Sequence, residues 1–564
     1  MENMNLTRTD NIIMLSGVTL LAFLFALFLT ECLCFMAGLR PGAWVLPVSF
    51  GLACGLSFVI SAGWRRALGA VGLSAAVIVL SAWICYQLYD TAFDSIGYHY
   101  NTVVMIDRGW NPYREYAWND SLWSMHYAKG LEVMQAAVLS FTGNLQTVRC
   151  VNLIFILSAA FIGWHALSLA VPSAGRKWRM AVLSVAVCNP VVISQMLSAM
   201  NDYALWVETM LLASCFVMMW KRPAEWLPYL LVFFTVAIGI NTKFTHFFYI
   251  GLECLFFALW CAVYRRWPIL GRGCVAVGAA ILAGVLLGYN PYVINTLDYG
   301  SPVYPLGGSA HTVDIMSGNT PDIYLGDNRF VNFAKSLLSV ADSPWALLNG
   351  NITAGGILRS YSQDMAVNGF GVFMPLMMLL GVALMWMVRA KTRWWVLYLF
   401  VLGMALCFEQ SWWARYIPFL WMLVVLPLIL ALDSERFHHR PVHCAAVVLT
   451  ALALVNGVLS LGAALSSRLS YTAYINYVFD SHAVIRVTPL TYGLRQQFDE
   501  RGVRYNECLN ADSLDYSSGE YFLIFGTNSS MEHIMQLPAA EFSRLYPDTH
   551  EALPFYVRVD DRRL

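Results

Sequence analysis

Long apolar runs constrain this chain more than any other feature. Roughly thirteen stretches of about 20 residues carry almost no charge, and each is long enough to cross a bilayer as a helix. The first lacks a small-residue cleavage site, so we expect it to be retained as an anchor. The sequence therefore predicts an all-α polytopic membrane protein. The runs cover residues 13–36, 43–62, 67–89, 150–170, 180–197, 204–220, 226–242, 247–264, 272–289, 369–388, 394–408, 416–432 and 444–465.

The composition supports this class and excludes others. Hydrophobic residues make up 58% of the chain and charged residues 12%, whereas a soluble domain averages about 25% charged residues. The formal net charge is zero, so we expect membrane lipids and no nucleic acid among the partners. Most of the 13 cysteines fall inside apolar runs, without the spacing of a disulfide framework or a zinc site, which indicates small buried hydrophobes.

Lysine and arginine recur in alternate loops, and short cytoplasmic loops are enriched in these residues. This alternation supports the number of runs and predicts a cytoplasmic N-terminus, in what we expect to be a bacterial inner membrane. It places the loop after Asp94, the turn at Asp202, residues 290–368 and the C-terminal tail outside. The basic loops contain Arg65 and Arg66; Arg176, Lys177 and Arg179; Lys221 and Arg222; Arg265, Arg266 and Arg272; Arg389, Lys391 and Arg393; and Arg436 and Arg440.

The chain divides into two predicted domains. Residues 1–465 form the transmembrane domain, including outer loops at 90–149 and 290–368, and the second loop is rich enough in Pro, Gly and aromatic residues to be an ordered cover. Residues 466–564 are more charged and contain a helix-like run, LTYGLRQQFDERG, and strand-like runs, YFLIFGT and FYVRV. They predict a small extracytoplasmic α/β domain.

Polar residues gather in the first outer loop, which reads DSIGYHYNTVVMIDRGWNPY and then WSMHYAKGLEVMQAAVLSFTGNLQTVR. DSIGYH, RGWNPY, HYAKGLE and GNLQTVRCVNLIF resemble the GT-C superfamily of membrane glycosyltransferases, and look most like the bacterial protein mannosyltransferase and lipid A aminoarabinose transferase group. The similarity continues through NPVVISQMLSAMNDYALW, GINTKFTH, YNPYVINTLDYGSPVYPL and EQSWWARY, in the family's order. Two extra apolar runs precede the loop, and the C-terminal domain matches nothing in this family.

The resemblance implies transfer of a sugar from a polyprenyl-phosphate donor to a glycan, lipid or protein acceptor at the outer surface. Such chemistry requires a carboxylate near the acceptor hydroxyl and cations near the leaving phosphate. By motif, Asp94 is the catalytic carboxylate, with a helix cap as the alternative. His99 is a second candidate, and interfacial packing is its alternative.

Asp202 is the third catalytic candidate, since the family's second outer loop often carries an acidic residue facing the first. A helix cap is again the alternative. Asn201 and Gln195 lie beside it and are candidate substrate-binding residues. Two separated acidic residues serve with or without a divalent cation such as Mg²⁺ or Mn²⁺, so the sequence leaves the metal dependence of Asp94 and Asp202 open.

The remaining candidates are expected to bind substrate. Lys129 and Glu132 belong to the KGLE motif, and a plain i, i+3 ion pair is their alternative. Arg415 is the stronger phosphate ligand because a guanidinium binds phosphate oxygens bidentately. Glu409 is expected to neutralise it, and Tyr416 adjoins it. Lys243 and His246 follow an outer turn where the phosphate explains a lysine, and a snorkelling lysine is the alternative.

Three ionisable residues, His165, Glu208 and Glu253, fall within or near apolar runs and are interpreted as hydrogen-bond partners between helices. A second hypothesis is a transporter or flippase of lipid-linked or polar solutes. Such proteins bind near the bilayer midplane, which is almost wholly apolar here, and no internal repeat is evident. A polymerase or ligase of whole oligosaccharides is a relative of the first hypothesis.

Overall fold

A computed structural model describes residues 8–61, 63–119, 121–308, 319–341, 343–363, 367–479, 485–487, 489–508, 521–525 and 533–537. Helices make up most of these residues, which confirms the predicted all-α membrane class. Within the described ranges, seven helices are long and apolar enough to cross a membrane: Thr9–Ala37, Trp64–Tyr86, Leu145–Ala170, Tyr203–Lys221, Phe244–Val263, Trp267–Leu287 and Arg440–Ala473.

Five further apolar helices are shorter: Val45–Ile60, Leu227–Thr242, Met374–Met387, Thr392–Cys407 and Pro418–Asp433. The run predicted at 180–197 is broken. It forms α8 (Arg176–Val187) and α9 (Pro190–Gln195), because Pro190 starts a new helix whose N-cap, Asn189, accepts a hydrogen bond from the backbone of Val191. The count of thirteen full spans stays a prediction.

The central helix is α1 (Arg8–Ala37), which packs against α7 (Cys150–Ala170), α2 (Val45–Ile60) and α3 (Trp64–Tyr86). The inner face of α3 repeats small residues at helical spacing, from Ala67 through Ala70 and Ser74 to Ser81, and small residues let helices approach closely. Its outer face exposes large apolar residues such as Val79 and Trp83, as a lipid-facing surface does.

Helices α10 (Tyr203–Lys221), α11 (Leu227–Thr242), α12 (Phe244–Val263) and α13 (Trp267–Leu287) continue the bundle. A second group contains α19 (Met374–Met387), α20 (Thr392–Cys407), α21 (Met422–Asp433) and α22 (Arg440–Phe479). The 3₁₀ segments η5 (Ala414–Tyr416) and η6 (Pro418–Trp421) join α20 to α21, and η7 (Glu435–His438) follows α21.

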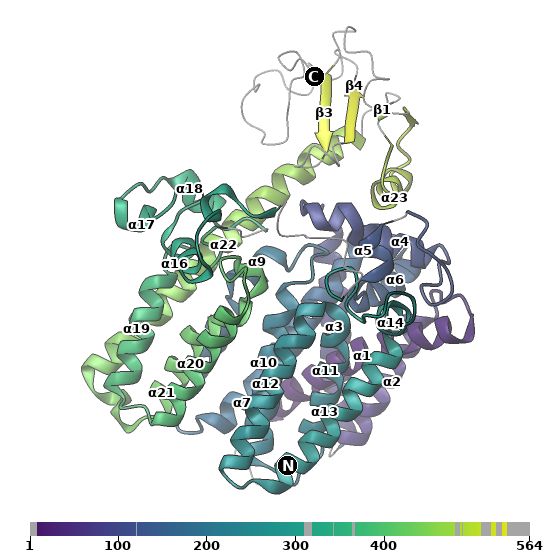
Figure 1. Cartoon of the computed structure of the whole chain (residues 1–564). Helices are drawn as coiled ribbons and strands as arrows, with labels where there is room; N and C mark the ends of the chain where they lie inside the picture. Colours follow the sequence, from purple (N-terminus) through teal and green to yellow (C-terminus); the bar gives the residue numbers. More distant parts are fainter. Residues whose placement is uncertain are drawn as a thin grey trace.

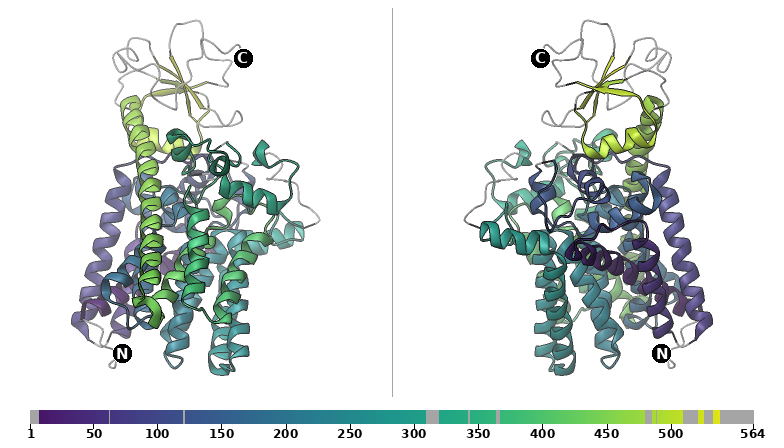
Figure 2. Two further views of the ribbon diagram at one scale, coloured as in Figure 1. Left: turned by 90° about the vertical axis from the view of Figure 1, so that its left-hand side faces the viewer. Right: turned by 90° about the vertical axis from the view of Figure 1, so that its right-hand side faces the viewer.

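The segments predicted to lie outside gather at the end of the bundle opposite the N-terminus (Figures 1 and 2). After α3 they are η1 (Ser95–His99), α4 (Tyr100–Asp107), α5 (Leu122–His126), α6 (Gly130–Thr142) and η2 (Leu145–Arg149). After α13 they are η3 (Tyr289–Val293), α14 (Ile294–Tyr299), η4 (Asp322–Tyr324), α16 (Arg329–Leu338), α17 (Ala346–Asn349) and α18 (Ala354–Arg359).

Helix α22 continues without a break past residue 465, the predicted domain boundary, to Phe479, and the division into two domains stays a prediction. At 1.5 Å per residue its 40 residues extend about 60 Å, which is twice the thickness of a hydrocarbon core. The helix therefore leaves the bundle and leads toward the C-terminal strands (Figure 1).

The C-terminal residues form β1 (Ile485–Val487), α23 (Tyr492–Glu500), β2 (Tyr505–Glu507), β3 (Tyr521–Phe525) and β4 (His533–Leu537), with strand order β2-β1-β4-β3. The β1–β2 pair is parallel, and the other two pairs are antiparallel. Both the helix and the first strand predicted in this region are present. The second predicted strand, FYVRV, lies outside the described residues.

Candidate functional site

Asp94 directly precedes η1, at the end of the loop that follows α3. The alternative of a helix cap is not observed, because its side chain makes no capping hydrogen bond. Instead, Oδ2 accepts a hydrogen bond of 2.7 Å from Nη1 of Arg415. The side chain of Asp94 is 24% exposed, so this carboxylate is accessible from outside the protein.

Arg415 lies in η5, in the connection between α20 and α21. Its guanidinium carbon lies 4.4 Å from the ring centroid of Trp413, and Nη1 lies 3.7 Å from Oδ2 of Asp202. Arg415 therefore bridges Asp94 and Asp202, which come from different outer loops. A planar guanidinium suits this position because it stacks on an aromatic ring and binds carboxylates at its edge.

Asp202 immediately precedes α10 and also makes no capping hydrogen bond with its side chain. Its Oδ1 accepts a hydrogen bond from Nζ of Lys243, and its Oδ2 accepts one of 3.3 Å from Nε2 of Gln195. Burial opposes ionisation of Asp202, but Lys243 and Arg415 lower its pKa to about 2. Asp202 is therefore a carboxylate anion at neutral pH.

Lys243 lies between α11 and α12, with Nζ 4.6 Å from the ring centroid of Tyr416. Burial alone would lower the pKa of Lys243, but Asp202 raises it, so the ammonium stays charged. Two anions and two cations form one group that is buried except for Asp94, which is half-buried; it is here named the ionic cluster and consists of Asp94, Asp202, Lys243 and Arg415. The snorkelling alternative for Lys243 does not apply, since the ammonium is buried.

His99 and Glu132 form a separate buried pair, with Nδ1 of His99 2.5 Å from Oε1 of Glu132. The alternative ion pair between Lys129 and Glu132 is wrong. Nζ of Lys129 instead donates to the carbonyl of Tyr127 at 2.8 Å and to Oδ1 of Asn290 at 2.7 Å. Burial lowers the pKa of Lys129 to about 7, and these bonds join the loop before α6 to η3.

His246 pairs with Glu208, and its Nδ1 lies 2.9 Å from Oε2 of the carboxylate. Glu253 accepts a hydrogen bond of 2.6 Å from the hydroxyl of Thr209, which links α12 to α10 as the sequence predicted for this residue. Both acidic side chains are buried along α10 and α12, on the bundle side of the ionic cluster.

The neighbours of Asp202 are held by the backbone. Nδ2 of Asn201 donates to the carbonyl of Thr242 at 3.1 Å, which joins the start of α10 to the end of α11. Oε1 of Gln195 accepts from the backbone of Tyr203 at 3.0 Å. Asn201 and Gln195 therefore fix the backbone around Asp202, and their expected contacts with substrate stay predictions.

Glu409 is not a partner of Arg415, so the expectation that it neutralises the guanidinium is wrong. It is exposed and lines a separate polar cavity of about 770 Å³ together with Asp327 and Arg329. The guanidinium of Arg415 forms ion pairs with Asp94 and Asp202 instead. The residues between Glu409 and Arg415 do not form a continuous helix. Their closeness in the sequence therefore does not bring the two side chains together.

Two tyrosines near the ionic cluster were missed by the sequence analysis. Burial raises the pKa of Tyr98, and Asp94 adds to this effect; burial likewise raises the pKa of Tyr127, which Lys243 opposes. Both hydroxyls therefore stay protonated, and the two tyrosines add no charge to the ionic cluster. Their positions beside His99 and in HYAKG offered a signal, but aromatic residues are common at membrane interfaces.

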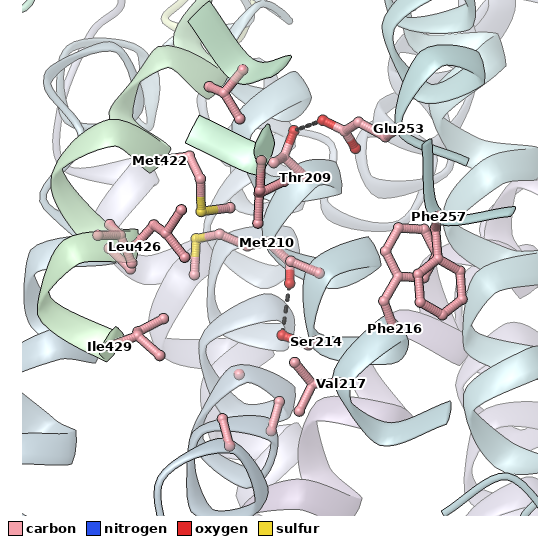
Figure 3. Close-up of a pocket in the computed structure, with 18 of the residues that line it drawn as sticks. Thr209, Met210, Ser214, Phe216, Val217, Glu253, Phe257, Met422, Leu426 and Ile429 are labelled. Carbon is pink, nitrogen blue, oxygen red and sulfur yellow. Dashed lines mark hydrogen bonds between the residues drawn. The ribbon is translucent and has the colours of Figure 1, made fainter. Parts of the chain in front are cut away.

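An apolar cavity of about 410 Å³ lies within the helices below the ionic cluster. Figure 3 shows Thr209 and its bond to Glu253 at one side of this cavity, with Met422, Leu426 and Ile429 of α21 facing Met210 of α10. Aromatic residues of α10 and α12 complete the wall, including Phe216 and Phe257, whose rings stack at 4.0 Å. The other lining residues come from α7, α8, α20 and η6.

A divalent cation does not fit the ionic cluster as it is arranged. Such an ion prefers free carboxylate oxygens, whereas Lys243 and Arg415 contact both oxygens of Asp202 and Oδ2 of Asp94 and would repel it. Within the described part of the chain, no three His, Cys, Asp or Glu side chains converge.

Comparisons with known proteins identify no relative of this chain. The likeness to the GT-C superfamily therefore depends on the sequence motifs alone. Scans against protein-family models, curated proteins and solved structures each find no match for this chain.

Proposed function

We propose that this chain is a membrane glycosyltransferase that moves a sugar from a polyprenyl-phosphate donor to an acceptor outside the cytoplasm. The observation that carries the proposal is the ionic cluster, in which Arg415 bridges Asp94 and Asp202. Carboxylates and phosphate-binding cations are the two kinds of group that this transfer requires, and here they lie within ion-pairing distance of one another.

The cations suit the phosphate of the donor. During transfer, a bond forms between the acceptor oxygen and the anomeric carbon, and the bond from that carbon to the phosphate oxygen breaks. The polyprenyl phosphate leaves with one additional negative charge, and the acceptor hydroxyl loses a proton. Arg415 and Lys243 stabilise the growing charge on the phosphate.

The two carboxylates differ in exposure and therefore in proposed role. The side chain of Asp94 is 24% exposed, whereas that of Asp202 is 3% exposed. Asp94 faces the acceptor and orients its hydroxyl for attack. Asp202 holds Lys243 and Arg415 in place for the phosphate.

The apolar cavity supports a donor carried on a lipid. Thr209, at its rim, is seven residues along α10 from Asp202, which corresponds to about 10 Å of helix. A polyprenyl chain matches such a cavity because burial of each CH₂ contributes about 0.8 kcal/mol. A donor whose phosphate binds at Arg415 would extend its polyprenyl chain along α10 into this cavity. The proposed membrane is a bacterial inner membrane.

The proposal is tested with the full chain in proteoliposomes and a panel of polyprenyl-phosphate pentoses and hexoses. Release of polyprenyl phosphate and the mass of the acceptor are measured. We expect Asp94→Asn and Asp202→Asn to abolish transfer without lowering expression. Asp298→Asn, an exposed carboxylate in the second outer loop, is the matched control and should keep full activity.

Full activity in both cluster variants would exclude these carboxylates from the chemistry. Movement of the lipid across the bilayer with its sugar unchanged would identify a flippase instead. Addition of many sugars at once to the acceptor would identify a polymerase or ligase.

A further inference from the structure

The pair formed by His246 and Glu208 lies next to the ionic cluster but has no role in the function proposed above. Lys243 and His246 are three residues apart at the start of α12, and Asp202 and Glu208 are six apart at the start of α10. His246 therefore lies one helical turn from Lys243, which binds Asp202. The two side chains of the pair are 1% and 0% exposed.

This pair is costly to bury. Within the described residues, no lysine or arginine pairs with Glu208, and neither of its carboxylate oxygens has a hydrogen-bond partner, although Oε2 lies 2.9 Å from Nδ1 of His246. Helix α11 passes directly beside it at Gly239, where a Cβ would lie 3.0 Å from Cδ of Glu208. An ionisable group held this tightly among apolar helices is commonly functional.

A third buried group borders the pair. The hydroxyl of Tyr203 is buried and has no hydrogen-bond partner within the described part of the chain, and Tyr203 interacts electrostatically with both Glu208 and Glu132. Buried polar groups almost always have partners, and exceptions concentrate where a water or a reacting group enters. The described residues between α6, α10 and α12 therefore include buried polar groups whose hydrogen-bonding capacity is not fully used.

The proposed transfer releases one proton from the acceptor hydroxyl, and this proton needs an acceptor. Asp202 is a weak proton acceptor because Lys243 and Arg415 lower its pKa, and Asp94 is already ion-paired with Arg415. The donor phosphate carries one negative charge when bound and two when it leaves. A proton acceptor next to the cluster would therefore keep the total buried charge constant.

We infer that the His246–Glu208 pair takes up the proton released by sugar transfer, with His246 as the acceptor and Glu208 as the positioning residue. The inference depends on the proposed glycosyl transfer. The acceptor O–H bond breaks, the proton passes to the imidazole, and the electron pair of that bond forms the new glycosidic bond. The pair changes from one negative charge to none while the phosphate gains one.

The charged surroundings of the pair are few. From α10 it faces Asp202 and Tyr203, and on α12 it lies between Lys243 and Glu253. Helix α11 contains no Asp, Glu, Lys, Arg or His, and α13 contains one such residue, Arg272, in its first two turns. Across Tyr203 lies Glu132 of α6, which pairs with His99. A pH dependence of transfer is therefore assigned to the His246–Glu208 pair only if it disappears in variants of that pair while His99 and the ionic cluster are intact.

The test compares His246→Gln and Glu208→Gln with the wild type in proteoliposomes. We expect each to lower kcat by about 100-fold, the usual contribution of proton transfer, with the donor KM within about twofold of wild type. The wild-type rate should fall at low pH, because a pair that already holds a proton accepts no other. This acidic limb should disappear in both variants.

Glu31→Gln is the matched control, since Glu31 is also a buried carboxylate in a membrane-length helix, α1, and has no part in the proposed site or cavity. It should keep the wild-type kcat and pH profile. The binding of polyprenyl phosphate, measured in the same preparations, separates catalysis from folding. Loss of that binding in parallel with kcat would assign the pair a structural role and overturn the inference.

An unchanged kcat and pH profile in His246→Gln would also overturn it while the proposed function stands. If the wild type transferred no sugar from any donor of the panel, the proposed function would fail first, and the inference with it.

Discussion

At the scale of single residues, Arg415 organises the candidate site because it contacts two carboxylates and two aromatic rings, those of Trp413 and Tyr416. Lysine is a compact point charge without a planar fork, so it would not reproduce these contacts. Lys243 makes a simpler contact, with one carboxylate and the ring of Tyr416. Loss of Arg415 should therefore disturb the candidate site more than loss of Lys243.

Replacement of either cation by alanine should weaken binding of a polyprenyl phosphate. Removal of a charged hydrogen bond costs about 1.5–3 kcal/mol, which corresponds to a loss of affinity of about 10- to 150-fold. The effect should be larger for Arg415→Ala, which leaves both Asp94 and Asp202 without this partner. Equilibrium binding of polyprenyl phosphate to the purified chain in detergent measures it.

Arg329→Ala is the control, because Arg329 is an exposed cation on the same side of the molecule. It should bind the lipid phosphate as the wild type does. Unchanged affinity in both Arg415→Ala and Lys243→Ala would contradict their assignment to the phosphate.

At the scale of elements, α23 attaches the C-terminal residues to the first outer loop. Oε1 of Glu500 accepts a hydrogen bond of 2.9 Å from the backbone of Leu145, and Oε2 accepts one of 3.1 Å from Asn144. Nη2 of Arg108 donates to Gln496 at 2.9 Å. These contacts place α23 over α4 and η2 rather than free in solution.

The attachment of α23 should depend on pH. Burial raises the pKa of Glu500 from its ordinary value near 4.5 to about 7. Between these values the docked state holds a proton that the undocked state has lost, so docking is most stable below about pH 4.5 and weakens as the pH rises to about 7. Hydrogen exchange of α23 should therefore be faster at pH 8 than at pH 5.5, after correction for intrinsic exchange.

Glu500→Gln should remove most of this difference, because the amide does not titrate. Glu507→Gln is the control, since Glu507 is exposed and bonded to Arg495. A pH dependence that persisted unchanged in Glu500→Gln would show that another group controls the docking of α23.

At the scale of the whole molecule, the candidate site is assembled from the outer ends of helices that are far apart in the sequence. Asp94 follows α3, Asp202 precedes α10, Lys243 precedes α12 and Arg415 follows α20. The first outer loop, α16 and α23 lie at this same end, opposite the N-terminus (Figure 1). The site and the C-terminal residues should therefore face one side of the membrane.

Reporter fusions test this sidedness in a bacterial host. Alkaline phosphatase is active only outside the cytoplasm, whereas green fluorescent protein fluoresces when it stays inside. We expect a phosphatase fused to the C-terminus of the full chain to be active and a fluorescent protein fused there to be dark, because the positive loops hold the opposite end inside. The N-terminal fusions should behave in the opposite way, and the reverse pattern would invert the proposed orientation.

The sequence predicted the helical class because a run of about 20 apolar residues has one stable arrangement in a bilayer, in which every backbone polar group is bonded within the segment. It also selected the members of the ionic cluster, through motifs that lie at helix ends. It did not predict how far α22 extends, since a helix continues past the bilayer wherever its residues tolerate helical geometry.

Only the tertiary structure decided the partners. Glu132 pairs with His99 rather than Lys129, and Arg415 pairs with Asp94 and Asp202 rather than Glu409. Sequence spacing fixes neighbours within one helix, but these contacts join loops that helix packing brings together. The hydrophobic pattern of the chain thus determined its elements, whereas the pairing of its few buried charges depended on which helix ends meet, because a buried charge is stable only beside a partner.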